Sequence, residues 1–204
     1  NSVSHNLLVK KTFPTKVHNS SFQCSIFGKN FTQSGIFMTR FFLELAQKRQ
    51  SDRLFDTTPL EKEKLEYILE AARIAPSACN AQPWKIIVVD SHQIKNQLAD
   101  ATSSRVLGMN HFTKQAPIHL VLVEEKASFT STFGSWAKKK HFPHIDIGIL
   151  AEHICLAAAE QGIGSCMIGW FNEKKVKNAL KIPYNKKVVL IITLGYSLQT
   201  VRSK

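Results

Sequence analysis

Several patterns are absent from this sequence of 204 residues, and each absence excludes a class of protein. The four cysteines form no C-x-x-C pair, and the first residues lack the apolar region of a signal peptide. The longest apolar run, Val188 to Leu194, is far shorter than the ~18 residues of a membrane-spanning helix. Neither a G-x-S-x-G motif nor a P-loop occurs. We therefore expect free thiols, no membrane association and a cytoplasmic location.

Acidic residues are missing from the first 37 residues, which contain four lysines and no arginine. No helical or strand period persists there, so we expect 1–37 to be a disordered or non-native extension and 38–204 to be the folded domain. The domain still carries 23 basic and 15 acidic residues, a net charge of +8. A basic surface attracts nucleic acid, anionic lipid or a phosphorylated cofactor without choosing among them.

Hydrophobic periodicity predicts a mixture of helices and strands. Helices are expected over 38–50, 58–75, 91–101, 145–161 and 172–180, and strands over 85–90, 118–124 and 188–195. Thr58 is expected to cap the second helix, with Glu61 completing a capping box. The helix over 145–161 is apolar on nearly all sides, which suggests burial against a second subunit. Because strands and helices do not alternate strictly, the predicted class is α+β.

Two guanidinium groups flank a hydroxyl in the segment Arg49-Gln50-Ser51-Asp52-Arg53, which follows a predicted helix. Arginine donates hydrogen bonds in a planar fork that suits phosphate and ring carbonyl oxygens. Taken alone, the segment is explained as well by a solvated helix end whose cations offset the helix dipole.

Small and uncharged polar residues gather in two further places. In the turn from Pro76 to Trp84, the side chains of Ser77, Asn80 and Gln82 suit the uracil-like edge of a flavin. An ordinary helix-to-strand loop is the alternative. The stretch 162–171 contains three glycines but lacks the Rossmann spacing. Gly162 fits a helix C-cap, and Gly169 would let a ligand ring approach the backbone, although a simple tight turn is also possible.

Two histidines, His141 and His144, flank Pro143. Proline is expected to keep the two rings off a shared helix face, and no neighbouring Cys or Glu completes a ligand set, so no metal site is predicted. The lysine runs 138–140 and 174–177 lack interleaved aromatic residues. Such runs are typical of solvated surfaces and not of nucleic-acid-binding ones.

In this order, these segments resemble the nitroreductase family of FMN-dependent NAD(P)H oxidoreductases. The most specific piece is A-R-I-A-P-S-A-C-N-A-Q-P-W-K over 72–85, followed by G-I-G-S-C-M-I-G and by a strand ending in L-G-Y. The likeness spans Met38 to about Tyr196. It implies a three-layer α/β/α fold with a central, mostly antiparallel sheet, and an intertwined homodimer with two FMN sites at the subunit interface.

The resemblance also assigns roles to individual residues. The phosphate, the ribityl chain and the N1/O2 edge of FMN would be contacted by Arg49, Gln50, Ser51 and Arg53. The partner subunit would contribute Pro76, Ser77, Asn80 and Gln82. The backbone near flavin N5 would be that of Ile168 and Gly169, and the phosphate clamp would be completed by Arg202 and Lys204.

The chemistry that the resemblance implies is carried by the cofactor, so no catalytic side chain is assigned. NADH or NADPH would pass hydride to flavin N5 and leave, and a nitro compound or quinone would then accept it at the same site. This sequence of events is ping-pong. One alternative is a flavoprotein of the same fold acting as a dehalogenase, enoate reductase or flavin reductase. A remote alternative, suggested by charge alone, is a nucleic-acid-binding domain. The expected partners are thus a second copy of the chain and a small-molecule acceptor, with no nucleic acid or membrane.

Overall fold

The computed structural model describes residues 34–103, 109–125 and 141–200, with side chains from residue 41 onward. Within these residues four strands form one antiparallel sheet in the order β1-β2-β4-β3. The strands are β1 (Trp84–Val89), β2 (Ile118–Glu124), β3 (Gly164–Ile168) and β4 (Lys187–Gly195). The β-branched run near the end of the chain is therefore an inner strand, as its sequence predicts.

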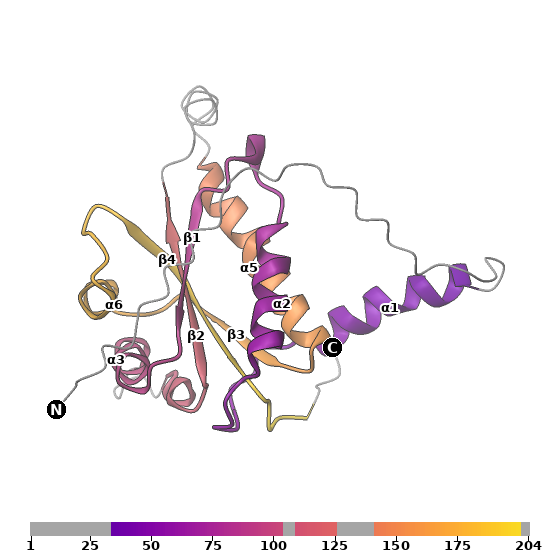
Figure 1. The fold of residues 1–204 in the computed structure, drawn as a ribbon, viewed down its shortest axis with the longest axis horizontal. Coiled ribbons are helices and arrows are strands. Elements are labelled where there is room, and N and C mark those ends of the chain that lie inside the picture. Colours follow the sequence, from indigo (N-terminus) through magenta and orange to yellow (C-terminus); the bar gives the residue numbers. More distant parts are fainter. Residues whose placement is uncertain (1–33, 104–108, 126–140, 201–204) are drawn as a thin grey trace.

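Helices cover both faces of this sheet, so the molecule has three layers (Figure 1). On one face lie α2 (Lys62–Arg73) and α5 (Phe142–Glu160), and on the other lie α3 (His92–Thr102) and α6 (Glu173–Leu180). Successive side chains of β2 alternate between the two resulting cores, because a strand points neighbouring residues to opposite faces. Leu120 and Leu122 belong to the α5 side, whereas Val121 and Val123 belong to the α3 side. The predicted α+β class and antiparallel sheet are confirmed.

α5 is the central helix of one layer. Pro143 lies in its first turn, where a proline removes no helical hydrogen bond. The helix ends in a Schellman motif, in which the amide of Ile163 donates to the carbonyl of Ala158 at 2.8 Å and Gly162 adopts a φ of +73°. The predicted C-cap at Gly162 is confirmed. By length and hydropathy α5 could cross a membrane, but 56% of that stretch is buried inside the fold, where α5 serves as a core helix.

One side of α5 is not fully covered by the described chain. This uncovered stripe consists of Ile145, Ile149, Glu152 and Leu156, which follow one another at helical spacing. Ile145 is 55% exposed. α1 (Ser34–Lys48) contacts α5 and also exposes apolar side chains, among them Phe41 and Phe42. Partly exposed apolar side chains of this kind are typical of an interface.

The helix starts agree with the sequence in one case and differ in another. Asn172 caps α6 by accepting a hydrogen bond from the amide of Lys175 at 3.0 Å, as predicted. The capping box predicted for α2 is wrong, because that helix begins at Lys62 without a side-chain cap. Thr58 instead donates both its amide and its hydroxyl to Asp56 Oδ1, at 2.8 and 2.7 Å.

The start of α1 at Ser34 lies four residues before the predicted domain boundary. Residues 34–37 are therefore helical, and the rest of the predicted extension lies outside the described residues.

Candidate functional site

The segment Arg49–Arg53, called here the arginine segment, follows α1 and lies against the start of β3. Ser51 forms a parallel bridge with Ser165. The amide of Asp52 donates to the carbonyl of Ser165 at 2.9 Å. At the far end, the amide of Arg53 donates to the side-chain oxygen of Gln199. The segment is thereby fixed between β3 and the chain that follows β4.

Asp52 holds this arrangement together, a role that no sequence motif marks. The residue is only 4% exposed. Its Oδ1 accepts hydrogen bonds from Gln50 Nε2 at 3.0 Å and from the hydroxyl of Ser197 at 2.5 Å, while Oδ2 accepts from the amide of Ser165 at 3.2 Å. A Cβ on Gly164 would come within 2.8 Å of this carboxylate, so the close approach needs glycine. The one sequence feature that points to this role is the position of an acidic residue between two arginines.

The two arginines of the arginine segment differ in exposure, and the Nε atom of Arg49 is buried. Arg49 is 27% exposed in its side chain and places Nε 3.3 Å from Glu152 Oε1 of α5, while Arg53 is exposed. A cavity of about 80 Å³ lies beside Arg49, and its lining also includes Gln50 and Ser165. Pockets for cofactor-sized ligands have volumes of roughly 300 Å³ or more. The described chain therefore offers a basic ledge and not a closed pocket.

The turn Pro76–Trp84, called here the polar turn, has a strained backbone. It contains the short helix η1 (Ala78–Asn80). Cys79, Asn80 and Gln82 have φ values of +51°, +51° and +43°. This left-handed region costs L-residues other than glycine about 1–2 kcal/mol each. Such outliers persist where surrounding structure holds them, and they cluster at functional sites.

Side-chain hydrogen bonds hold the polar turn in place. The amide of Ala78 donates to Asp146 Oδ1 of α5 at 3.1 Å, and the amide of Gln82 donates to the hydroxyl of Ser77 at 2.9 Å. The Gln82 side chain donates to the carbonyl of Arg73 at 3.2 Å. Ser77 and Gln82 are thus engaged in maintaining the turn, whereas Pro76 and Asn80 are exposed.

Ile168 ends β3 and Gly169 follows it. The Ile168 side chain is buried, with 3% exposed, whereas Gly169 is exposed. A Cβ placed on Gly169 would meet nothing within 4 Å. Nothing in the described chain requires glycine at this position, so its small size leaves space for something outside the chain.

One chain does not bring the arginine segment and the polar turn together. The turn is bonded to Asp146, near the start of α5, whereas the cavity beside Arg49 is lined by Ala159, near the end of α5. The rise along an α-helix is about 9 Å from Asp146 to Glu152, where Arg49 pairs, and about 20 Å from Asp146 to Ala159. Arg202 and Lys204, the predicted phosphate clamp, lie outside the described residues.

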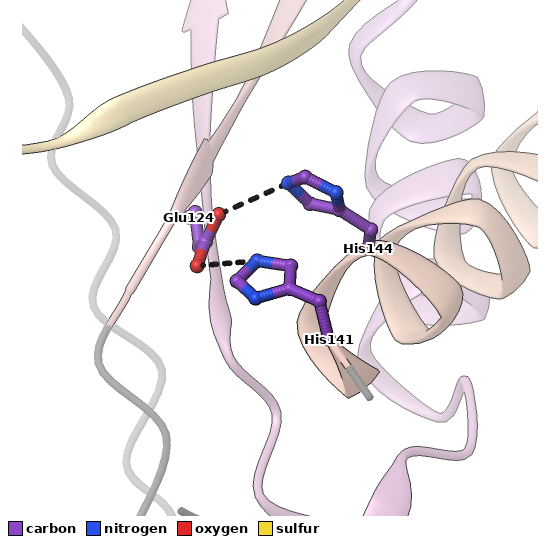
Figure 2. A group of neighbouring side chains, drawn as sticks. All are labelled: Glu124, His141 and His144. Carbon is purple, nitrogen blue, oxygen red and sulfur yellow. Dashed lines mark ion pairs between the residues drawn. The ribbon is translucent and has the colours of Figure 1, made fainter. Parts of the chain in front are cut away.

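Glu124, His141 and His144 meet beside the start of α5 (Figure 2). We call them the histidine–glutamate cluster. One oxygen of Glu124 lies 3.1 Å from His141 Nε2, and the other lies 3.3 Å from His144 Nε2. Burial, followed by the charges of His141 and Lys187, lowers the pKa of His144. The expectation that Pro143 separates the two rings is wrong, because His141 is the N-cap and His144 lies one turn later on the same face.

The remaining chemistry-bearing groups agree with the sequence analysis. Cys79, Cys155 and Cys166 are free thiols, and Cys24 lies outside the described residues. Burial raises the pKa of Cys155 to about 12, which makes it an inert core residue. Lys174 and Lys175 lie exposed on α6, as expected of a solvated face, but Lys177 is largely buried and pairs with Glu173 Oε1 at 2.7 Å. The run 138–140 lies outside the described residues.

The fold is thus an antiparallel α+β fold of three layers, with a basic ledge beside β3 and a strained polar turn before β1. The sequence profile of the nitroreductase family matches residues 46–196. The chain belongs to this family.

Known proteins similar to this chain include enzymes with different substrates. An oxygen-insensitive NADPH nitroreductase of Helicobacter pylori is 27% identical over 179 residues, which covers 74% of this chain and 85% of that protein. An iodotyrosine deiodinase of Thermotoga neapolitana is 24% identical over 177 residues, covering 77% and 89%. The solved structure of an FMN-dependent nitroreductase of Clostridium difficile R20291 has a TM-score of 0.65 and 30% identity, covering 79% of this chain and 91% of that one.

Proposed function

We propose that this chain is an FMN-dependent NAD(P)H oxidoreductase that works by a ping-pong route on an electron-poor acceptor such as a nitro compound or a quinone. The observation that carries the proposal is the arginine segment, which is held against β3 by the buried carboxylate of Asp52. Membership of the nitroreductase family and the likeness to an FMN-dependent nitroreductase support the same cofactor.

The donor set of the chain fits FMN. Guanidinium groups suit a phosphate and the oxygens of the flavin ring, and the ledge offers the exposed Arg53 and the half-buried Arg49. The exposed amide of Asn80 suits the polar edge of the ring. The open space at Gly169 is compatible with close approach of a planar group to the backbone. When bound, FMN would supply the hydride chemistry.

The chain's own residues would bind and orient. Arg53 would place a positive charge near the N1/O2 edge, where negative charge develops on reduction. Asp52 would keep the arginine segment in one conformation, so that little ordering is needed on binding. No side chain is assigned as a general acid or base, because solvent can protonate a reduced nitro group or quinone.

We propose further that two copies of the chain form each site. The polar turn contacts α5 at Asp146, whereas the arginine segment lies beside Glu152 and Ala159, about 9–20 Å further along the helix axis, so a second chain would be needed to bring a turn to each arginine segment. The uncovered stripe of α5 and the exposed aromatic residues of α1 offer the apolar surface that a homodimer would bury.

A second candidate acts on a different substrate with the same cofactor. The relative from Thermotoga neapolitana is an iodotyrosine deiodinase, which favours reductive removal of halogen from an aromatic ring as an alternative activity. The two candidates share the flavin site and differ only in the acceptor.

The experiment is reconstitution followed by reduction. Purified full-length chain is incubated with FMN, passed through a desalting column, and inspected for the flavin band near ~450 nm. NADH and NADPH are then compared as reductants under anaerobic conditions in a stopped-flow instrument. Reduced protein is mixed in turn with a nitroaromatic, a quinone and an iodinated tyrosine. Protein that retains no FMN, or whose bound FMN neither pyridine nucleotide bleaches, would contradict the proposal.

A further inference from the structure

The histidine–glutamate cluster is not used by the proposed flavin chemistry. Glu124 comes from the last position of β2, whereas His141 and His144 come from the start of α5. Figure 2 shows both imidazole rings directed at the same carboxylate, one nitrogen to each oxygen. We propose that these three side chains form a binding site for a divalent transition-metal ion, for which zinc is the best match.

The geometry of the cluster is close to that of a metal site. One ligand atom from each residue lies within 4.8 Å of the other two. The distances from the Glu124 oxygens to His141 Nε2 and His144 Nε2 are 3.1 and 3.3 Å. Ligand atoms around a tetrahedral zinc ion, bound at about 2.0–2.2 Å, are separated by roughly 3.3 Å. Small side-chain rotations would therefore place all three atoms at coordinating distance.

The donor types select the class of ion. Two imidazole nitrogens and one carboxylate suit zinc and its neighbours in the first transition series. Magnesium and calcium prefer sites built from oxygen ligands, so a site with two histidines disfavours them. Three protein ligands leave a coordination position for water. His141 and His144 are 56% and 40% exposed in their side chains, so an ion can enter from solvent.

Lys187 competes for the cluster. Its Nζ lies 3.3 Å from His144 Nε2, the atom that would bind the metal. The lysine is exposed and can swing into solvent, but its ammonium group must leave before an ion binds. Removing this charge should therefore strengthen metal binding.

A metal at this position would act on the polar turn. Glu124 pairs with Trp84, the last residue of the turn, and the amide of the next residue, Glu125, donates to the carbonyl of Pro83 at 3.0 Å. Asp146, which accepts from the turn at Ala78, lies two residues after His144 on α5. The ion would thus join the two elements that hold the turn, without contacting the flavin itself.

The test is zinc binding by the full-length chain, purified without a histidine tag and treated with EDTA before dialysis. Titration with zinc chloride in a calorimeter is expected to show one ion per chain that is lost in the variant His141→Ala/His144→Ala. Each single histidine variant and Glu124→Gln should weaken binding by about tenfold or more. Lys187→Met should bind zinc more tightly than the parent. Cobalt, with its visible absorption, serves as a second probe of the same ligands.

The matched control is His92→Ala, which removes an exposed histidine on α3, far from the cluster in the fold. This variant should bind zinc as the parent does. Thermal unfolding without metal establishes that each variant is folded, and zinc should raise the melting temperature of the parent but not of the double variant. The proposal is overturned if the parent does not bind zinc, or if the double variant binds it equally well. FMN retention plays no part in this test, so its failure would leave the proposed function standing.

Discussion

Asp52 and Ser165 are joined by two hydrogen bonds that run in opposite directions: the Asp52 amide donates to the Ser165 carbonyl at 2.9 Å, and the Ser165 amide donates to Asp52 Oδ2 at 3.2 Å. The same carboxylate accepts from two further side chains, at 2.5 and 3.0 Å. The arginine segment therefore owes its conformation to one buried acid.

Replacing that acid is expected to destabilise the protein and to weaken cofactor binding. Asp52→Asn removes the charge from several hydrogen bonds and turns one acceptor into a donor, which should cost about 1.5–3 kcal/mol in the free energy of unfolding. Urea denaturation measures the loss. Asp100→Asn, which breaks an exposed ion pair with Lys114, is the control and should cost under about 1 kcal/mol. Equal stability of the two variants would show that Asp52 is not the organising residue.

The arginines are expected to govern FMN retention. Arg49→Ala and Arg53→Ala each delete a charge-assisted contact worth roughly 1.5–3 kcal/mol, so the dissociation constant should rise about 10- to 100-fold. Quenching of FMN fluorescence on binding gives the constants. Glu152→Gln is the matched control, because it releases Arg49 from its partner on α5 and should leave FMN binding equal or stronger. If both arginine variants purify as yellow as the parent, the assignment fails.

A charge on the uncovered stripe should separate the proposed dimer. Leu156→Glu would place an unpaired carboxylate in the interface at a cost of about 3–5 kcal/mol, enough to raise the dimer dissociation constant more than 100-fold. Sedimentation equilibrium reports the oligomeric state. Tyr184→Glu alters a residue that is 68% exposed on the other side of the sheet, and this variant should remain dimeric. A parent protein that sediments as a monomer would contradict the two-chain site.

His119 should make the fold sensitive to mild acid. Burial, aided by the charge of Lys95, lowers the pKa of His119 from 6.5 to about 4. Below about pH 6.5 the imidazole is protonated in the unfolded chain but stays neutral in the folded chain. The free energy of unfolding therefore has its full value above that pH and falls as the pH drops toward 4. About 2 kcal/mol should be lost between pH 7 and pH 5. His119→Gln, whose amide can donate to the carbonyl of Thr113, should reduce this pH dependence. Parallel curves for parent and variant would exclude this residue as the cause.

Those parts of the fold with a strong local period could be predicted from the sequence. The strand at 118–124 has the predicted bounds because both of its faces are buried and its residues are apolar except His119 and Glu124. β3 could not be predicted, since five residues that begin with Gly164 carry little pattern, and the strand exists through its pairing with β4. The cap at Thr58 failed for a local reason, because Thr58 donates both its amide and its hydroxyl to Asp56 in the loop, and the helix begins only at Lys62.

Within the candidate site, groups formed by neighbouring residues could be predicted, whereas groups formed by residues far apart in the sequence could not. The arginine segment and the polar turn were visible because all of their residues are adjacent in the chain. The role of Asp52 depends on Ser165 and Ser197, more than a hundred residues away. The histidine–glutamate cluster likewise needs Glu124 from β2, which only the antiparallel sheet brings to the start of α5.

The polar turn and the arginine segment lie at different points along α5, so each site of the proposed dimer would need both chains. Each chain would contribute its polar turn to the flavin site of the other chain. A variant changed only at Arg49 and Arg53 could be mixed with a variant changed only at Asn80. Every heterodimer of the two would then contain one intact site. Two inactive preparations could thus rescue each other on mixing.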